Sequence, residues 1–110
     1  MKRRLLVVAL VIGAIAVAVP IALAANVGVT GKEFKFSLTT KTVRHGKVTF
    51  KFTNKGRLKH DFKIAGKKTS LIKPGKSATL TVSLKRGKYT YICTVPGHAA
   101  AGMKGTLKVS

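Results

Sequence analysis

The sequence predicts an all-β domain, a sandwich or small barrel, behind an apolar N-terminal segment. Apolar and polar residues alternate with a period of two in several short runs after residue 26, as in strands that bury one face. Turn-forming residues separate these runs, and no run after residue 26 has the periodicity of a helix. Short strands joined by turns are typical of sandwiches and small barrels.

The N-terminus begins with a basic tip and continues as an apolar run. Residues 2–4 read Lys-Arg-Arg, and residues 5–25 are almost entirely apolar and end in small side chains. This order is typical of an export signal, cut here after Ala24 or Ala25. The run is also close to the ~20 residues that span a bilayer as a helix. We therefore expect an exported protein, periplasmic, cell-surface or secreted, whose residues 1–25 are a signal peptide or an N-terminal membrane anchor.

Residues 26–110 form one expected domain with a modest core. The chain has a single cysteine, Cys93, so no internal disulfide stabilises this domain. A lone thiol in an oxidising compartment is a liability unless something occupies it. The cysteine therefore already suggests a bound metal.

Six runs predict the strands. In the first three, the apolar residues that share a face are Phe34, Phe36 and Leu38; Val48, Phe50 and Phe52; and Leu80, Val82 and Leu84. The other three runs are Leu58–Ile64, Tyr89–Cys93 and Gly105–Val109. The turns between runs contain glycine with proline, asparagine or a basic residue, at residues 44–46, 54–56, 73–75 and 86–87.

The charge is strongly one-sided. The chain has 22 Lys and Arg against 2 Asp and Glu, a net charge of +20. Without the three basic residues at 2–4, the domain keeps 19 basic side chains and a net charge of +17. One interpretation is a solvated surface that keeps the domain soluble. The other is a field that attracts anionic partners, such as acidic redox proteins, anionic lipid headgroups or cell-wall polymers. Export and the lack of a nucleic-acid-binding motif argue against nucleic acid.

Potential metal ligands gather in one loop. The stretch YICTVPGHAAAGMKG, residues 91–105, contains Cys93, His98 and Met103 among glycines and alanines. His60 lies in an earlier predicted strand, and the ends of adjacent strands can bring all four side chains together at one end of a sandwich. One thiolate, two imidazoles and one thioether are the donor set of blue-copper electron-transfer sites. A structural zinc site normally uses four Cys or His ligands and would leave the methionine unexplained.

Each of these residues also has a structural interpretation. Cys93 and Met103 can fill a core, His60 can be a hydrogen-bonded core histidine, and His98 can lie on a surface loop. The combination of all four favours the metal site. The third histidine, His45, lies in a predicted turn, and we expect no partner for it.

Two motifs carry a resemblance to a known family. The segments KHDF and CTVPGHAAAGMKGTLKV resemble the copper-binding segments of cupredoxins, the azurin and plastocyanin family. The resemblance implies a Greek-key β-sandwich or barrel that binds one type 1 copper ion. It implies that His60, Cys93 and His98 are the equatorial ligands and that Met103 is the axial ligand.

The sequence departs from azurin in two places. Four residues rather than three separate His98 from Met103, as in plastocyanin, which affects the methionine distance. Asp61 stands where the family often has asparagine, whose side chain ties the two ligand loops together. Asp61 can still accept hydrogen bonds, for example from Thr94, but it cannot donate as an amide does. As a carboxylate near the copper it is expected to lower the reduction potential.

The expected function is one-electron transfer between redox partners by a monomer. Small or apolar residues surround the loop histidine and form an expected docking patch: Val95, Pro96, Ala99, Ala100 and Ala101. We do not expect an enzyme, because three histidines cannot supply a second, multi-histidine copper cluster and nothing in the sequence pairs Glu33 with Asp61. Two alternatives are a non-redox copper carrier or storage protein, and a basic cupredoxin-like module that binds the anionic cell envelope.

Overall fold

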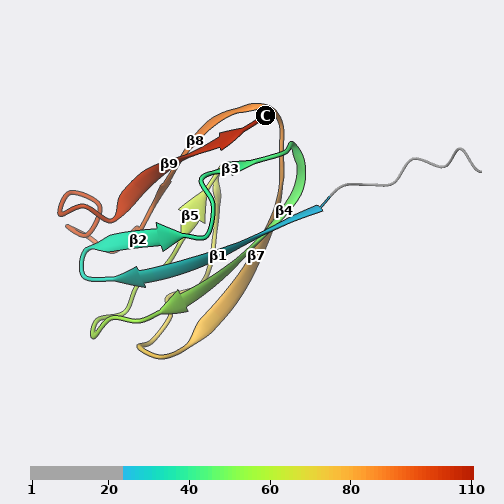
Figure 1. The fold of residues 1–110 in the computed structure, drawn as a ribbon. Helices are drawn as coiled ribbons and strands as arrows, with labels where there is room; N and C mark the ends of the chain where they lie inside the picture. Colours follow the sequence, from blue (N-terminus) through green and yellow to red (C-terminus); the bar gives the residue numbers. More distant parts are fainter. Residues whose placement is uncertain (1–23) are drawn as a thin grey trace, which may run out of the picture.

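The computed structural model describes residues 24–110, which form two packed β-sheets (Figure 1). The first sheet contains, in spatial order, β2 (Lys35–Leu38), β1 (Ala24–Lys32), β4 (Gly46–Asn54) and β7 (Ser77–Leu84). The second contains β3 (Thr42–Val43), β9 (Lys104–Val109), β8 (Gly87–Ile92), β5 (Lys63–Ile64) and β6 (Lys67–Lys68).

The predicted all-β class is confirmed for the described residues. The expected N-terminal signal or anchor helix lies outside them, and the part of the chain that the structure covers has no helix able to cross a bilayer. The division at residue 25 stays a prediction. Strand β1 begins just before it, since Ala24 and Ala25 already pair with Lys47 and Val48 of β4.

Most neighbouring strands are antiparallel, but β1 pairs with β4 in parallel and β3 pairs with β9 in parallel. These pairs arise because the chain crosses between the sheets. After the β1–β2 hairpin it enters the second sheet as β3 and returns to the first as β4. Parallel neighbours need such a crossover, since a tight turn can join only antiparallel strands.

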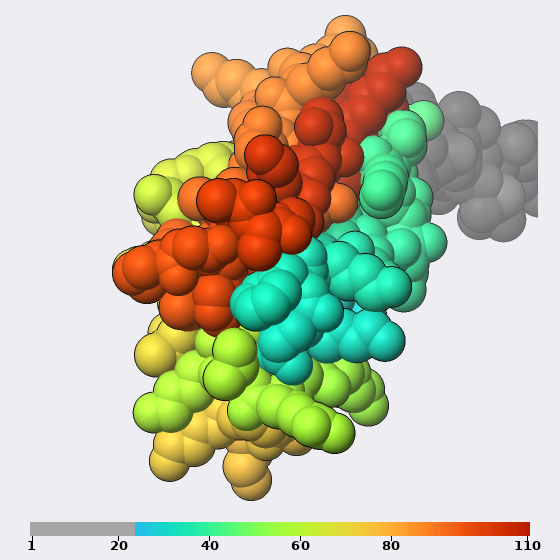
Figure 2. Space-filling model, turned by 90° about the vertical axis from the view of Figure 1, so that its left-hand side faces the viewer, coloured from blue at the N-terminus to red at the C-terminus, as the bar shows by residue number. Residues whose placement is uncertain are grey.

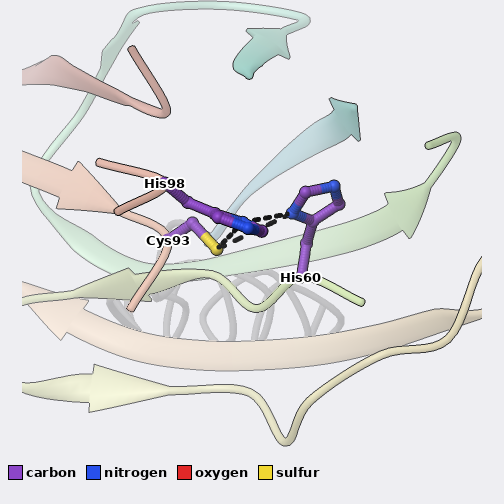
Figure 3. Close-up of side chains that lie close together, drawn as sticks. All are labelled: His60, Cys93 and His98. Atoms are coloured by element: carbon purple, nitrogen blue, oxygen red, sulfur yellow. Dashed lines mark hydrogen bonds between the residues drawn. The ribbon is translucent and has the colours of Figure 1, made fainter. Parts of the chain in front are cut away.

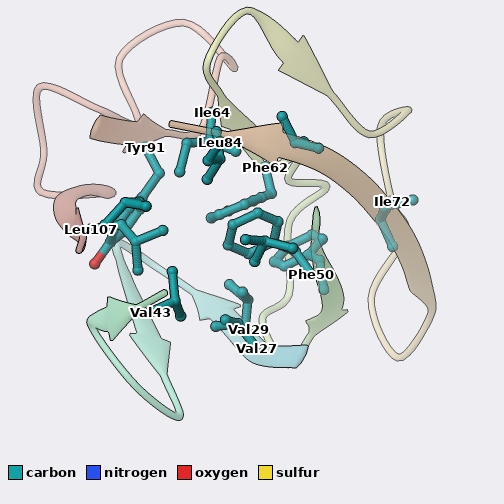
Figure 4. Packing of buried hydrophobic residues seen from close by; sticks show 14 residues of the cluster. Val27, Val29, Val43, Phe50, Phe62, Ile64, Ile72, Leu84, Tyr91 and Leu107 are labelled. Atoms are coloured by element: carbon teal, nitrogen blue, oxygen red, sulfur yellow. The ribbon is translucent and has the colours of Figure 1, made fainter. Parts of the chain in front are cut away.

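The core lies between the two sheets (Figure 4). Its centre is aromatic. The Phe62 ring lies 5.2 Å from Phe50, 5.5 Å from Phe36 and 5.6 Å from Tyr91, centroid to centroid. The predicted inward faces of β4 and β7 are confirmed at Val48, Phe50, Phe52, Val82 and Leu84, which are buried.

The predicted strand Leu58–Ile64 is wrong over most of its length. Only Lys63 and Ile64 belong to a strand, β5, while His60 forms an isolated bridge with Ile72. The pairing breaks because the Thr69 side chain accepts the Phe62 N–H at 3.2 Å, which takes that donor away from a regular ladder. His60 therefore lies in a loop.

Two further differences concern strand ends. The sequence did not predict β1 as a strand, because its buried positions are Val27, Val29 and Gly31, and only two of these carry an apolar side chain. Strand β8 ends at Ile92, so Cys93 follows the strand directly. Its N–H still bonds to the Met103 carbonyl at 3.1 Å, which places it at the mouth of the β8–β9 hairpin.

Replacing Phe50 by alanine should lower the free energy of unfolding by about 3–5 kcal/mol, because it removes a fully buried ring and leaves a cavity. Urea unfolding of the metal-free protein measures this. Leu71→Ala is the control, because that side chain is 52% exposed and its loss should change stability by no more than about 0.5 kcal/mol. Equal losses in the two variants would contradict this placement of the core.

Candidate metal centre

Three predicted ligands meet at one end of the sandwich (Figure 3). His60 comes from the β4–β5 loop, Cys93 from the end of β8 and His98 from the β8–β9 loop. The His60 and His98 Nδ1 atoms lie 3.0 Å apart, and the Cys93 Sγ lies 3.8 Å and 3.6 Å from them. His60 and Cys93 are buried, and His98 is 9% exposed.

The spacing of these atoms fits a metal ion. Nitrogen and sulfur ligands about 2.0–2.3 Å from a metal, arranged as a triangle around it, lie about 3.5–4 Å from each other. The two sulfur–nitrogen distances already fall in or near this range, and the nitrogen–nitrogen distance is about half an ångström shorter. A small opening of the two imidazoles completes the triangle. Two imidazoles and one thiol in this arrangement are the donors of a His₂Cys copper site.

Asn54 fixes the loop that carries His60. This side chain is fully buried at the end of β4. Its Nδ2 group donates to the Leu58 and Ile72 carbonyls at 2.8 Å each, and its Oδ1 accepts the Gly56 N–H at 2.8 Å. One amide therefore ties together the two segments whose bridge contains His60.

Backbone hydrogen bonds fold the β8–β9 loop around His98. The His98 carbonyl accepts the Met103 N–H at 3.0 Å, and the His98 N–H donates to the Val95 carbonyl at 3.0 Å. Gly97, with φ of 83°, makes the left-handed turn that this path requires. Met103 is fully buried, and its main chain is bonded to both Cys93 and His98.

Asp61 ties the two ligand loops together, as expected. Its carboxylate accepts the Thr94 N–H at 2.6 Å and also the Thr94 hydroxyl hydrogen. Asp61 follows one ligand and Thr94 follows another, so these bonds set the distance between the His60 and Cys93 main chains.

The site residue that the sequence analysis missed is Glu33, in the turn between β1 and β2. Its Oε2 lies 2.5 Å from the His60 Nε2, and the carboxylate also accepts the N–H groups of Arg57 at 2.8 Å and Leu58 at 3.2 Å. Its only signal in the sequence was being one of two acidic residues in a very basic chain. Nothing local connects it to a histidine 27 positions away.

The same turn also covers the second imidazole. The Phe34 ring meets the His98 ring edge-on, with centroids 5.0 Å apart. Gly102 lies so close to this turn that a Cβ there would be 2.9 Å from the Phe34 carbonyl oxygen. Figure 2 shows the orange β8–β9 loop directly against the turquoise segment around β2.

Burial and charge set the protonation of the site. The Arg57 N–H bond is the largest cause that lowers the pKa of Glu33 to about 2, and the bonds from His60 and Leu58 add to it. Burial raises the pKa of the Cys93 thiol, although backbone hydrogen bonds from Asp61 and Val95 oppose this. Burial, and then the His60 charge, lowers the pKa of His98. His98 therefore offers a neutral nitrogen, and the Cys93 thiol needs a bound cation to ionise readily.

Residues 23–110 match the family described as copper binding proteins of the plastocyanin/azurin family. The chain belongs to this family. Its cofactor is copper, and His60, Cys93 and His98 are positioned to form a type 1 copper site.

Individual relatives agree with this family. Auracyanin-B of Chloroflexus aurantiacus is 49% identical over 43 residues, which are 38% of this chain but only 18% of that relative. The structure of auracyanin A, described as a blue copper protein from the same species, has a TM-score of 0.69 at 23% identity, covering 80% of this chain and all of that one. A copper-containing nitrite reductase from Thermus scotoductus has a TM-score of 0.64 at 20% identity, over 80% of this chain and 28% of the reductase. The two structural comparisons show a shared fold.

The third histidine lies away from this centre. The His45 N–H bonds to the Ser110 carbonyl at 2.8 Å, and the His45 Nδ1 lies 3.0 Å from the same oxygen. The expectation that His45 has no partner was wrong, because β3 and β9 run in parallel and bring the residues that follow them together. The contact of His45 with Ser110 is structural and is not part of the metal centre.

Replacing Asn54 by alanine should lower the free energy of unfolding by at least about 2 kcal/mol, because it removes the partner of three backbone groups in and near the buried loop. Urea unfolding of the metal-free protein measures this. Thr53→Ala is the control on the same strand, since its hydroxyl makes only an exposed bond to Ser77. A loss no larger than that of the control would contradict the assigned role of Asn54.

Proposed function

We propose that the protein is an exported type 1 copper protein that carries single electrons between redox partners. One observation carries the proposal: two imidazole nitrogens and a thiol sulfur lie within 4.8 Å of one another. They converge on one point from three segments. Hydrogen bonds within the protein hold each segment in place.

The residues proposed to hold the copper are His60, Cys93, His98 and Met103, which would supply two imidazole nitrogens, a thiolate and a thioether. Met103 is supported by its burial and by main-chain bonds to the other two loop ligands. When bound, copper supplies the one-electron redox chemistry of the site. A set of ligands held rigidly needs little rearrangement between the two oxidation states.

The chain's own residues provide the route to a partner. His98 is the ligand closest to solvent, and Phe34, 38% exposed, lies against its ring. Small residues, Ala99 to Ala101, follow it in the loop. This surface would let a partner approach the His98 ring closely, and the basic domain would attract acidic partners over longer distances.

The proposal includes residues 1–25 as a signal peptide or anchor and a monomeric, non-enzymatic domain. Among the described residues, His45 lies beside Ser110, which follows β9, whereas the metal centre lies at the beginning of β9. His45 is therefore too far away to supply another ligand.

The net charge supports a second candidate, a cupredoxin-like module that binds the anionic envelope. Salt-sensitive binding to anionic vesicles without a reversible redox potential would favour it.

The decisive measurement is the visible absorption spectrum after Cu(II) is added to the purified protein. A thiolate–copper site of this kind should give an intense band in the visible spectrum, the blue band. Cys93→Ser should abolish the band, because it removes the thiolate, while His45→Ala should leave it unchanged. The absence of this band in the unsubstituted protein would contradict the electron-carrier proposal.

Asp61→Asn should raise the reduction potential of the copper protein. The substitution removes a negative charge beside two ligand loops while an amide oxygen remains to accept from Thr94. Negative charge favours Cu(II) over Cu(I), so its loss favours the reduced state. Protein-film or solution voltammetry measures the potential. If it stayed the same while the blue band persisted, Asp61 would act only as a structural tie.

A further inference from the structure

We propose that Glu33 is a positioning residue of the copper site: its carboxylate fixes the His60 ring, directs its Nδ1 toward the other ligands and lowers the reduction potential. This inference rests on the proposed function. The sequence motifs assign no role to this residue.

Glu33 contacts the His60 ring nitrogen that faces away from the other ligands. The Glu33 Oε2 lies 2.5 Å from the His60 Nε2, on the opposite side of the ring from the Nδ1 that faces Cys93 and His98. The imidazole is fully buried, and the carboxylate is only partly exposed. His60 is therefore held between a carboxylate on one nitrogen and the metal position on the other.

The pairing decides which nitrogen can bind copper. An ionised carboxylate only accepts hydrogen bonds, so the short contact requires the hydrogen to sit on Nε2. In the neutral ring, Nδ1 then carries a lone pair, and this nitrogen faces the His98 Nδ1 and the Cys93 Sγ in the site. A histidine ligand that donates its other N–H to a carboxylate keeps its tautomer and orientation and becomes more basic.

The surrounding loop is shaped to receive the carboxylate. Glu33 accepts the N–H groups of Arg57 and Leu58, just before His60, so it fixes the main chain as well as the ring. A Cβ at Gly56 would collide with the Glu33 carboxylate. The absence of a side chain at Gly56 therefore leaves the space that the Glu33 carboxylate fills.

The charge distribution adds a second argument. The chain has 22 basic and only 2 acidic side chains, and both acidic ones contact the site, Glu33 at His60 and Asp61 at Thr94. A carboxylate paired with a ligand imidazole adds negative charge close to the metal. This stabilises Cu(II) more than Cu(I) and lowers the potential.

The test is the reduction potential of copper-loaded Glu33→Gln. Loss of an outer partner of a metal-bound histidine typically weakens metal affinity ten- to a hundredfold. We expect the ratio of Cu(I) to Cu(II) binding constants to rise about tenfold, which is a potential about 59 mV higher for a one-electron couple. The blue band should persist, because all four proposed ligands remain.

Two further variants separate the bond from the charge. Ser110→Lys changes the net charge by the same amount at the far end of β9 and should leave the potential nearly unchanged. Gly56→Ala keeps the carboxylate charge but displaces it from its place, and should raise the potential by part of the Glu33→Gln shift. Equal shifts in Glu33→Gln and Ser110→Lys would overturn the inference.

The metal-free protein gives a readout that does not depend on copper. Nitrogen-15 NMR should show His60 of the unsubstituted protein carrying a slowly exchanging hydrogen on Nε2. A hydrogen on Nδ1 instead would overturn the inference even if Glu33→Gln failed to fold. An intact blue band with an unchanged potential in Glu33→Gln would overturn it while leaving the proposed function standing. A missing band in the unsubstituted protein would overturn the proposed function itself.

Discussion

His60 is fully buried, and each of its ring nitrogens lies within hydrogen-bond distance of a polar partner, Glu33 on one side and His98 on the other. A buried polar group without a partner costs about 1–3 kcal/mol in proteins. The position of the loop that carries this ring is therefore constrained, because both ring nitrogens must lie within hydrogen-bond distance of their partners. Asn54, Glu33 and the bridge to Ile72 all act on that one loop. The metal site follows from this constraint, because the position left between the nitrogens and the thiol is where a cation fits.

The sandwich brings these segments to the same end of the molecule. The β1–β2 turn carries Glu33 and Phe34, the end of β4 carries Asn54, and the β8–β9 hairpin carries Cys93 and His98. Parallel pairing of β1 with β4 puts the ends of those two strands side by side, with Gly31 opposite Asn54. The Lys55 N–H bonds to the Gly31 carbonyl at 2.8 Å and extends that contact into the loop. The fold thus supplies fixed anchor points, and short loops between them carry the ligands.

Local patterns predicted what is local in this structure. Alternation predicted β4 and β7, because a strand with one buried face repeats every two residues. The ligands within the β8–β9 loop were predicted from their spacing and chemistry, and the role of Asp61 was implied by the resemblance to cupredoxins. The loop around His60 was misassigned because side chains of Asn54, Glu33 and Thr69 and a single bridge to Ile72, rather than a regular ladder, satisfy its backbone. Glu33 could not be predicted, because its contact with His60 depends on how the first sheet pairs, which no single run of residues reveals.

Under the proposed function, the two signs of charge in this protein have separate tasks, and distance explains the separation. The basic side chains are spread over a solvated surface, where salt screens their fields beyond about 8–10 Å. They act mainly on a partner approaching through solvent. The two carboxylates are held within hydrogen-bond distance of the ligand loops, partly shielded from water, where screening is weak. Both carboxylates would therefore act at short range on copper held by these loops, so the potential and the attraction of partners can be set by different residues.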